Sequence, residues 1–264
     1  EFSQTKISMD LNFIDTHCHL YLKDFVHDVH EVIRTAKQAG IKKFYFPAID
    51  SETYEAMLNL ENAYPGVCIS MTGLHPCSVK ENWKSELEFV HSTLEKKAWC
   101  AIGEIGLDYY WDTSFAKEQQ VVFTQQMEWA LAFKRPIVIH TRNAMQDTID
   151  MVKPFAQKGL SGIFHCFGDS YTMATQIVDM GFFLGIGGVI TYKKAAMGEV
   201  LDKIDLQHIV LETDAPYLTP VPNRGKRNES CYIPLIAAKL AEIKQCSLEE
   251  VAMVTTANAE KIFG

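Results

Sequence analysis

The sequence predicts a (β/α)8 TIM barrel, an α/β fold made of a single domain. Eight short apolar segments, rich in residues that favour strands, alternate along the chain with segments that have the hydrophobic spacing of helices. The length of 264 residues is common for such a barrel. An open, doubly wound parallel sheet is the alternative, because it is built from the same alternation.

The expected strands lie at 13–17, 43–48, 67–73, 100–106, 136–141, 162–167, 182–188 and 208–214. Helical spacing is clearest between them at 27–40 and 116–135. Gly40 stands where the first of these helices should end, and Gly159 and Gly181 precede strands in the same way. Residues 1–8, EFSQTKIS, are expected to be a remnant of recombinant expression, which leaves 9–264 for the barrel.

Composition narrows the class of protein. The formal net charge of −8 argues against a protein that coats nucleic acid with a broad basic surface, although a nuclease that grips a short strand locally remains compatible with it. The seven cysteines are scattered and form no C-x-x-C pair, so we expect a reducing, cytoplasmic compartment. No apolar run approaches the ~20 residues of a membrane span, and we expect no membrane partner.

Side chains that can bind metal or transfer protons occur on five expected strands or just after them, mostly at the carboxyl ends where barrel enzymes carry their active sites. The histidine pair of FIDTHCHL is the first example, because alternate residues of a strand share a face and two imidazoles suit a divalent metal. Any one histidine is more often structural, but the recurrence at several strand ends favours a site. These residues are His17, His19, Glu104, His140, His165 and Asp214.

The same segments carry a family resemblance. DTHCHL, GLHP, AIGEIGLDYY, VIHTR, HCF and LETDAPYLTP followed by NRGKRNES occur in this order. With them, the chain resembles the TatD family of metal-dependent deoxyribonucleases, which belongs to the amidohydrolase-like barrels. The resemblance runs from about Asp10 to the C-terminal TTANAEKIFG.

The resemblance implies two adjacent divalent metal ions. His17, His19 and Asp214 would hold the first ion. His140 and His165 would hold the second, with Glu104 bridging both. A mixed nitrogen and oxygen donor set suits Zn²⁺ or Mn²⁺ better than Ca²⁺, while Mg²⁺ stays open.

Asp214, Glu104 and His75 are the candidates for catalytic residues, and Glu212 is a candidate for a supporting role. Asp214 is expected to orient or deprotonate the attacking water, or else only to bind metal. Glu212 shares its strand face and is expected to support a ligand. His75 of GLHP would contact a phosphate or donate to the leaving group, unless it is a structural turn residue; Cys77 stands where family members often have a second histidine.

Substrate binding is expected from cationic groups near the same strand ends. Arg142 follows His140 closely and offers a planar fork to a phosphate, with a surface salt bridge as the alternative. The RGKRN loop is the second candidate, with a solvated charge run as its alternative; it contains Arg224, Gly225, Lys226, Arg227 and Asn228. Ser230, two residues after this loop, replaces a proline that is common in the family. The difference affects the conformation expected for the loop.

The aromatic run Tyr109, Tyr110 and Trp111 is expected either to stack on unpaired bases or to pack in the core. We expect a DNA phosphodiesterase with two metal ions, and the family resemblance implies that it trims single-stranded or 3′ ends exonucleolytically. Hydrolysis of another ester or amide is the nearest alternative, and a non-catalytic metal-binding protein is the alternative of a different class. The sequence leaves the oligomeric state open, a monomer included.

Overall fold

The computed structural model describes residues 11–193 and 196–264, so the expected expression remnant and Met9 lie outside the described residues. The predicted barrel is confirmed. The strands are β1 Phe13–Asp15, β2 Ile41–Phe46, β3 Cys68–Ser70, β4 Ile102–Asp108, β5 Ile137–Arg142, β6 Gly162–Phe164, β7 Phe183–Ile186 and β8 Ile209–Leu211. The α-helices are α1 Val29–Gln38, α2 Ser51–Ala63, α3 Trp83–Thr93, α4 Ala116–Ala132, α5 Met145–Ala156, α6 Tyr171–Asp179, α7 Met197–Lys203, α8 Ile233–Lys244 and α9 Leu248–Phe263. Short 3-10 helices are η1 Lys23–Phe25, η2 Pro76–Ser78, η3 Gly188–Thr191, η4 Leu206–His208 and η5 Ser230–Tyr232.

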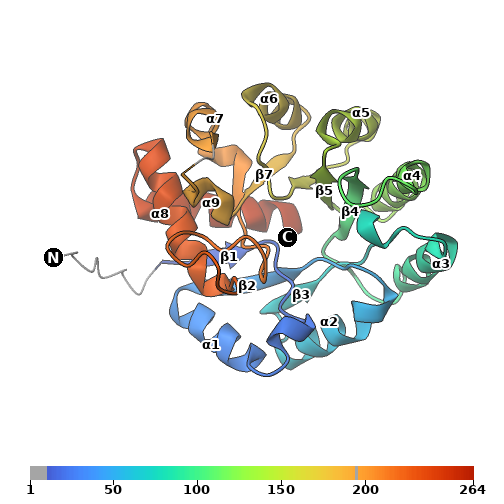
Figure 1. Cartoon of the computed structure of the whole chain (residues 1–264), viewed down its shortest axis with the longest axis horizontal. Helices are drawn as coiled ribbons and strands as arrows, with labels where there is room; N and C mark the ends of the chain where they lie inside the picture. The colour runs from blue at the N-terminus through green and yellow to red at the C-terminus, as the bar shows by residue number, and fades with distance from the viewer. Residues whose placement is uncertain (1–10, 194–195) are drawn as a thin grey trace.

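The strands surround one axis and the helices lie outside them (Figure 1). All strand pairs are parallel, in the orders β1-β2-β3 and β4-β5-β6-β7-β8. Two links join these sheets into a ring. Thr72 bridges to Ile102 between β3 and β4, and the Thr16 N–H donates to the Leu211 carbonyl, 3.1 Å away, between β1 and β8. The ring, which an open doubly wound sheet lacks, excludes that alternative.

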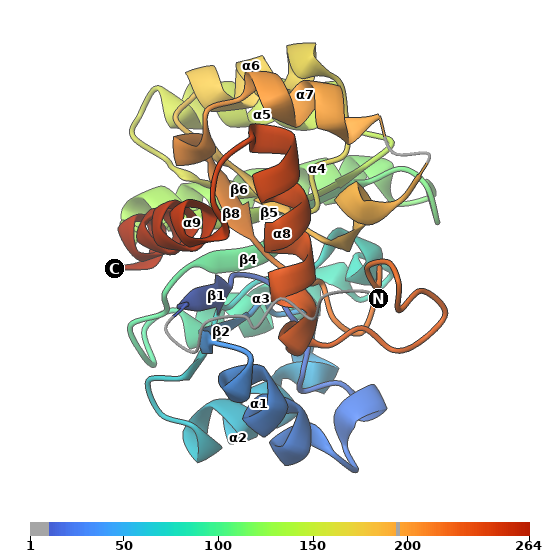
Figure 2. The ribbon, with the colours of Figure 1, turned by 90° about the vertical axis from the view of Figure 1, so that its left-hand side faces the viewer.

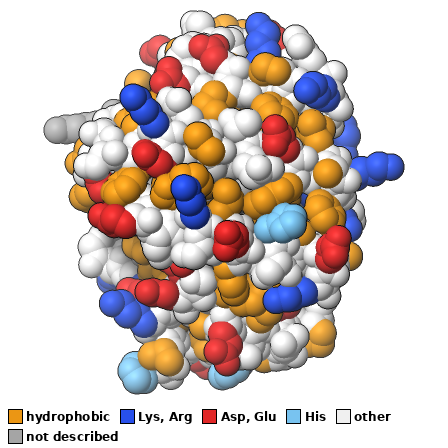
Figure 3. Space-filling view, turned by 90° about the vertical axis from the view of Figure 1, so that its right-hand side faces the viewer, with side chains coloured by type: hydrophobic (Ala, Val, Ile, Leu, Met, Phe, Trp, Pro, Cys, Tyr) orange, Lys and Arg blue, Asp and Glu red, His pale blue; other side chains and the backbone are white. Residues whose placement is uncertain are grey.

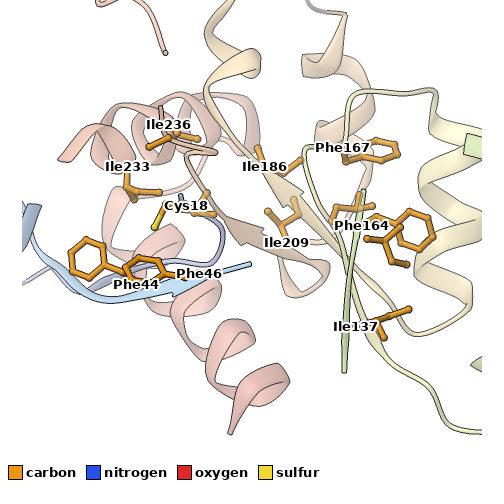
Figure 4. Packing of buried hydrophobic residues seen from close by; sticks show 14 of the residues in the cluster. Cys18, Phe44, Phe46, Ile137, Phe164, Phe167, Ile186, Ile209, Ile233 and Ile236 are labelled. Atoms are coloured by element: carbon orange, nitrogen blue, oxygen red, sulfur yellow. The ribbon is translucent and has the colours of Figure 1, made fainter. Parts of the chain in front are cut away.

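Successive side chains of each strand point alternately out of the barrel and into it, and so form two apolar layers. Outward-facing residues pack against the helices, as Figure 4 shows for Phe44 and Phe46 of β2 and for Ile209 of β8. Residues next to them in the sequence, Tyr45 and Val210, belong to a second cluster inside the ring. This period of two is the ordinary consequence of strand geometry, and it fixes which side chains reach the interior.

One end of the barrel is filled by the C-terminal helix. Ala259 and Phe263 of α9 join the interior cluster, where the Phe263 ring stacks on Tyr45 with 4.0 Å between ring centroids. Figure 2 shows α9 at one end of the barrel and the connection from β8 to α8 at the other. Any large polar site therefore lies at the end that this connection borders, where the strands terminate.

An extra residue in β4 decides where Glu104 points. Gly103 pairs with Val138 and Ile105 pairs with Ile139, so two steps along β4 match one step along β5. A Cβ on Gly103 would meet Val138 and the Met71 sulfur inside the ring, whereas Ile105 packs in the outer layer. Without this bulge, Glu104 would face the helices. With it, the carboxylate enters the barrel.

The surface does not gather positive charge on the face that Figure 3 shows, where acidic and basic side chains are interspersed among apolar ones. This agrees with the negative net charge of the chain. Among the helices of the described residues, none combines the length and the apolarity that crossing a membrane requires.

Candidate metal centre

The six predicted ligands converge at the end of the barrel opposite α9. Glu104 and His140 lie on β4 and β5, while the other four residues follow the ends of β1, β6 and β8 by one to four positions. His17, His19, Glu104 and His165 are buried, and His140 and Asp214 are partly buried. Groups of three ligand atoms within 4.8 Å of one another occur repeatedly among these residues. A cluster of this density needs a reason other than packing.

Glu104 lies between two pairs of imidazoles. Its Oε2 is 3.1 Å from Nε2 of His17 and 3.5 Å from Nε2 of His19. Its Oε1 is 3.0 Å from Nδ1 of His140 and 3.4 Å from Nε2 of His165. Each carboxylate oxygen therefore faces a different histidine pair, which is the arrangement that a bridging ligand requires.

The charge of Glu104 is maintained by the same neighbours. Burial alone would raise the pKa of its carboxyl, but His75, His17 and His165, together with the hydrogen bond from His140, hold that pKa well below its usual value. Glu104 is thus an anion at neutral pH in spite of complete burial.

Asp214 lies beside the pair formed by His17 and His19. Its Oδ1 is 3.5 Å from Nε2 of His17 and 3.4 Å from Nε2 of His19. Asp214 has φ of 57°, a left-handed conformation that aspartate tolerates better than most residues, and its N–H donates to the His17 carbonyl. Burial would raise its pKa, but His165, His19 and His17 hold it below the usual value.

Three of the four predicted ligand histidines have a buried acceptor for one ring nitrogen. Nδ1 of His165 donates to Oε1 of Glu212, 2.9 Å away, and Nε2 of His140 donates to Oδ2 of Asp108, 2.7 Å away. His19 donates from Nδ1 to the hydroxyl of Tyr21, which itself donates to the Pro47 carbonyl. In each case the other ring nitrogen faces Glu104 and is the one that a metal ion would bind. The donor set, with such supporting acceptors, fits divalent metal ions.

His17 is held in a different way. Its ring stacks on that of His165 with centroids 3.5 Å apart, and its Nδ1 has no partner among the described residues. Burial and the neighbouring His165 lower the pKa of His17, so its imidazole is neutral. For His165, burial lowers the pKa but Glu212, Glu104 and Asp214 raise it to about 10, so a cation binding there displaces a proton.

His75 differs from these histidines because its tautomer makes it a donor toward the centre. Its Nδ1 accepts the N–H of Cys77, so in the neutral ring the proton is on Nε2, which lies 3.2 Å from Oε1 of Glu104. Burial lowers the pKa of this ring. The geometry suits donation to an oxygen of a ligand in the site better than metal binding.

Two supporting residues were not predicted. Asp108 lies on β4 two positions beyond Gly106 and four beyond Glu104, so the period of two could have indicated its inward direction. Tyr21 follows His19 outside any strand, and no periodicity indicates its role. The predicted support from Glu212 is directed to His165 and to the Cys166 N–H, and not to the neighbouring Asp214.

Ser230 has a structural role that the loop sequence did not reveal. Its hydroxyl donates to Oδ2 of the buried Asp15 at 2.6 Å, and the Thr213 hydroxyl donates to the same oxygen. Oδ1 of Asp15 accepts the N–H groups of Thr213 and His17. Asp15 thereby ties the segment that carries His17 to the segment that carries Asp214.

Arg227 and Asn228, which are predicted to bind phosphate, make their contacts within the protein in this structure. Arg227 donates to both carboxylate oxygens of Asp28 and to Glu229, so its charge is neutralised within the protein. Asn228 is 0% exposed, and its amide donates to the Thr213 and Tyr217 carbonyls. Both residues hold the loop after β8 in place.

The other predicted cations are exposed. Arg142, at the end of β5, lies over the Tyr110 ring, with Cζ 3.7 Å from its centroid. Arg224 lies over Tyr192 at 3.9 Å, and Lys226 is exposed in the same loop. None of these three side chains forms a salt bridge with another described residue, in contrast to Arg227.

Comparison with known proteins shows the family to which the chain belongs. The family described as TatD related DNase matches residues 14–264. The chain belongs to the TatD family. A metal-dependent hydrolase of Bacillus subtilis, YabD, which is itself uncharacterized, is 35% identical over 94% of this chain and 98% of its own length.

Two further relatives of this TatD-family protein cover nearly the whole chain. The 3′-5′ ssDNA/RNA exonuclease TatD of Yersinia pseudotuberculosis is 32% identical over 90% of this chain and 94% of its own length. The crystal structure of YjjV, a TatD homologue from Escherichia coli, has a TM-score of 0.90 at 30% identity and covers 95% of this chain and 97% of that one. This protein is a metal-dependent hydrolase.

The hydroxyl of Tyr21 provides a test of the supporting shell. Tyr21→Phe removes the acceptor of His19 and should weaken metal binding by about 10- to 100-fold, the usual effect of losing such a partner. Titration with a competing chelator measures this affinity. Tyr45→Phe is the matched control, because Tyr45 is equally buried but lies in the apolar interior layer. Equal affinities in the two variants would show that Tyr21 does not orient His19.

Proposed function

We propose that the TatD-family centre of this chain binds two divalent ions and hydrolyses phosphodiester bonds of DNA. The observation that carries this proposal is the position of Glu104, whose two oxygens face two separate histidine pairs. His17, His19 and Asp214 would hold one ion, and His140 and His165 the other. Four imidazoles and two carboxylates favour Zn²⁺ or Mn²⁺, with Mg²⁺ as the third candidate.

A paired site of this kind suits a phosphodiester. When bound, two divalent ions activate a water on one side of the phosphorus and neutralise the charge of the leaving oxygen on the other. The orientation of the water and the transfer of protons would fall to two neighbouring side chains, Asp214 and His75. Asp214 has an anionic carboxylate within reach of both pairs, as its proximity to His17 and His165 indicates, and would orient the water or accept its proton. His75 would donate from Nε2 to a phosphate or leaving-group oxygen.

The choice of DNA, of single strands and of 3′ ends is also part of the proposal. It is supported by the family match and by the relative named as a 3′-5′ ssDNA/RNA exonuclease. It agrees with a negative net charge, which does not suit wrapping of duplex, and with the exposed cations Arg142, Arg224 and Lys226 predicted for substrate binding. RNA and DNA share the phosphodiester, so both belong in the test.

A substrate panel tests the proposed function directly. We expect metal-dependent release of mononucleotides from a single-stranded oligonucleotide, slower release from blunt duplex, and loss of activity with a chelator. The controls are cyclic amides and lactones, which amidohydrolase-like barrels also accept as substrates. Turnover of an amide or lactone without any cleavage of oligonucleotides would replace the proposal with the alternative reaction. Metal binding with no turnover of any substrate would indicate a non-catalytic metal-binding protein.

Substitution of Asp214 separates metal binding from proton transfer. Asp214→Asn keeps an oxygen donor but cannot accept a proton, so the variant should retain substantial metal and lose about 10²–10⁴-fold in kcat. Glu104→Ala is the contrasting variant and should lose metal from both sites, because both pairs share this carboxylate. Elemental analysis and steady-state kinetics measure the two effects. A rate near that of the unaltered protein in metal-loaded Asp214→Asn would refute the role of general base.

The salt dependence of cleavage tests the cationic loop after β8. Two phosphate contacts to a single strand give a slope of about −1.4 in a plot of log affinity against log salt concentration. The double variant Arg224→Ala, Lys226→Ala should flatten this slope and raise KM without changing metal content. Arg34→Ala, Lys239→Ala is the control that removes equal charge from α1 and α8. If both double variants shift the slope equally, the loop acts only through net charge.

A further inference from the structure

Two aromatic side chains beside the metal centre are left exposed by the fold. Tyr110 is 50% exposed and Trp111 is 69% exposed, and they follow β4 directly. Tyr109, the third residue of the run, is partly buried against the core, and its hydroxyl accepts from Gln120. Packing therefore explains Tyr109 but not the other two, since an indole that exposed gains little from burial.

Arg142 is associated with this pair. Its guanidinium covers one face of Tyr110, with Cζ 3.7 Å from the ring centroid, and lies 5.1 Å from the Trp111 centroid. The Tyr110 and Trp111 rings meet edge to face with their centroids 4.8 Å apart. Because Arg142 has no carboxylate partner among the described residues, its charge is available to an anion. An exposed indole and an available guanidinium thus occur in one group of side chains.

Asp108 fixes this group relative to the catalytic centre. Its Oδ2 accepts from Nε2 of His140, while its Oδ1 accepts the N–H groups of Tyr110 and Trp111 at 3.0 and 3.2 Å. Arg142 pairs with Asp108 in the sheet and lies two positions beyond His140 on β5. The same carboxylate therefore orients a predicted metal ligand and the backbone that carries both aromatic side chains.

We propose that Tyr110, Trp111 and Arg142 form a platform that holds an unpaired nucleobase next to the phosphate under attack. This rests on the proposed nuclease function and adds the part of the substrate that is recognised. The base stacks on the exposed indole of Trp111, Tyr110 supports the guanidinium, and Arg142 binds the flanking phosphate. A paired base has both faces covered by its neighbours, so the platform selects single-stranded ends.

The experiment compares two oligonucleotides of equal length and charge. One carries ordinary nucleotides at its 3′ end, and the other carries abasic tetrahydrofuran residues there. Base stacking on an aromatic side chain is worth about 5- to 100-fold in affinity, so the unaltered protein should prefer the first substrate by about that factor in kcat/KM. Trp111→Ala should remove the preference by lowering kcat/KM for the substrate with bases to about the value for the abasic substrate.

Further variants separate stacking from other effects. Trp111→Phe should restore much of the preference and Trp111→Leu should not, since leucine is apolar but has no aromatic face. Phe133→Ala is the control, because Phe133 is an aromatic residue with 36% exposure at the C-terminal end of α4, far along the barrel from the strand ends. Loss of the preference in Phe133→Ala, or its full retention in Trp111→Ala, would overturn the proposal.

Binding measured without hydrolysis distinguishes failure of the platform from failure of the proposed function. Fluorescence anisotropy of the two labelled oligonucleotides, with a chelator present, reports binding alone. If the protein cleaves neither substrate but prefers the one with bases, and Trp111→Ala loses that preference, the platform stands and the nuclease function fails. If it cleaves both substrates equally and binds both equally, the nuclease function stands and the platform is refuted.

Discussion

The carboxylate of Glu104 is the constraint on which the rest of the centre depends. A charged group with this degree of burial is stable only where several donors or cations surround it, and here imidazoles from four different strand ends do so. The bulge in β4 places it inside the ring. Each histidine around it then needs its own acceptor on the far ring nitrogen, which Tyr21, Asp108 and Glu212 provide for three of the four predicted ligand histidines.

The centre has a clear division between groups that bind and groups that position. Three of the predicted ligand histidines have an acceptor on the ring nitrogen that faces away from Glu104, whereas His75 turns an N–H toward Glu104 because its Nδ1 accepts the Cys77 N–H. This distinction comes from hydrogen-bond partners and not from residue type. It is consistent with the proposed role of His75 as a donor to substrate oxygens, in a site whose other imidazoles are suited to metal.

The mouth of the barrel combines few free positive charges with exposed aromatic rings. Arg227, one of the two arginines predicted in this loop for substrate binding, is paired with Asp28 and Glu229. Arg142 and Arg224 instead lie over tyrosine rings. With the polyanionic substrate that we propose, stacking on these rings would add binding that does not depend on the phosphate contacts, which weaken as salt rises.

The sequence by itself determined the barrel and the convergence of the six candidate ligands, because strand alternation and the rule that parallel strands end at one edge are local and topological facts. Tertiary structure decided the rest. The inward turn of Glu104 depends on a register shift between two strands, and the pairing of Arg227 with Asp28 joins residues about two hundred positions apart. Such contacts leave no periodic signal in the chain, since they arise only when distant segments meet.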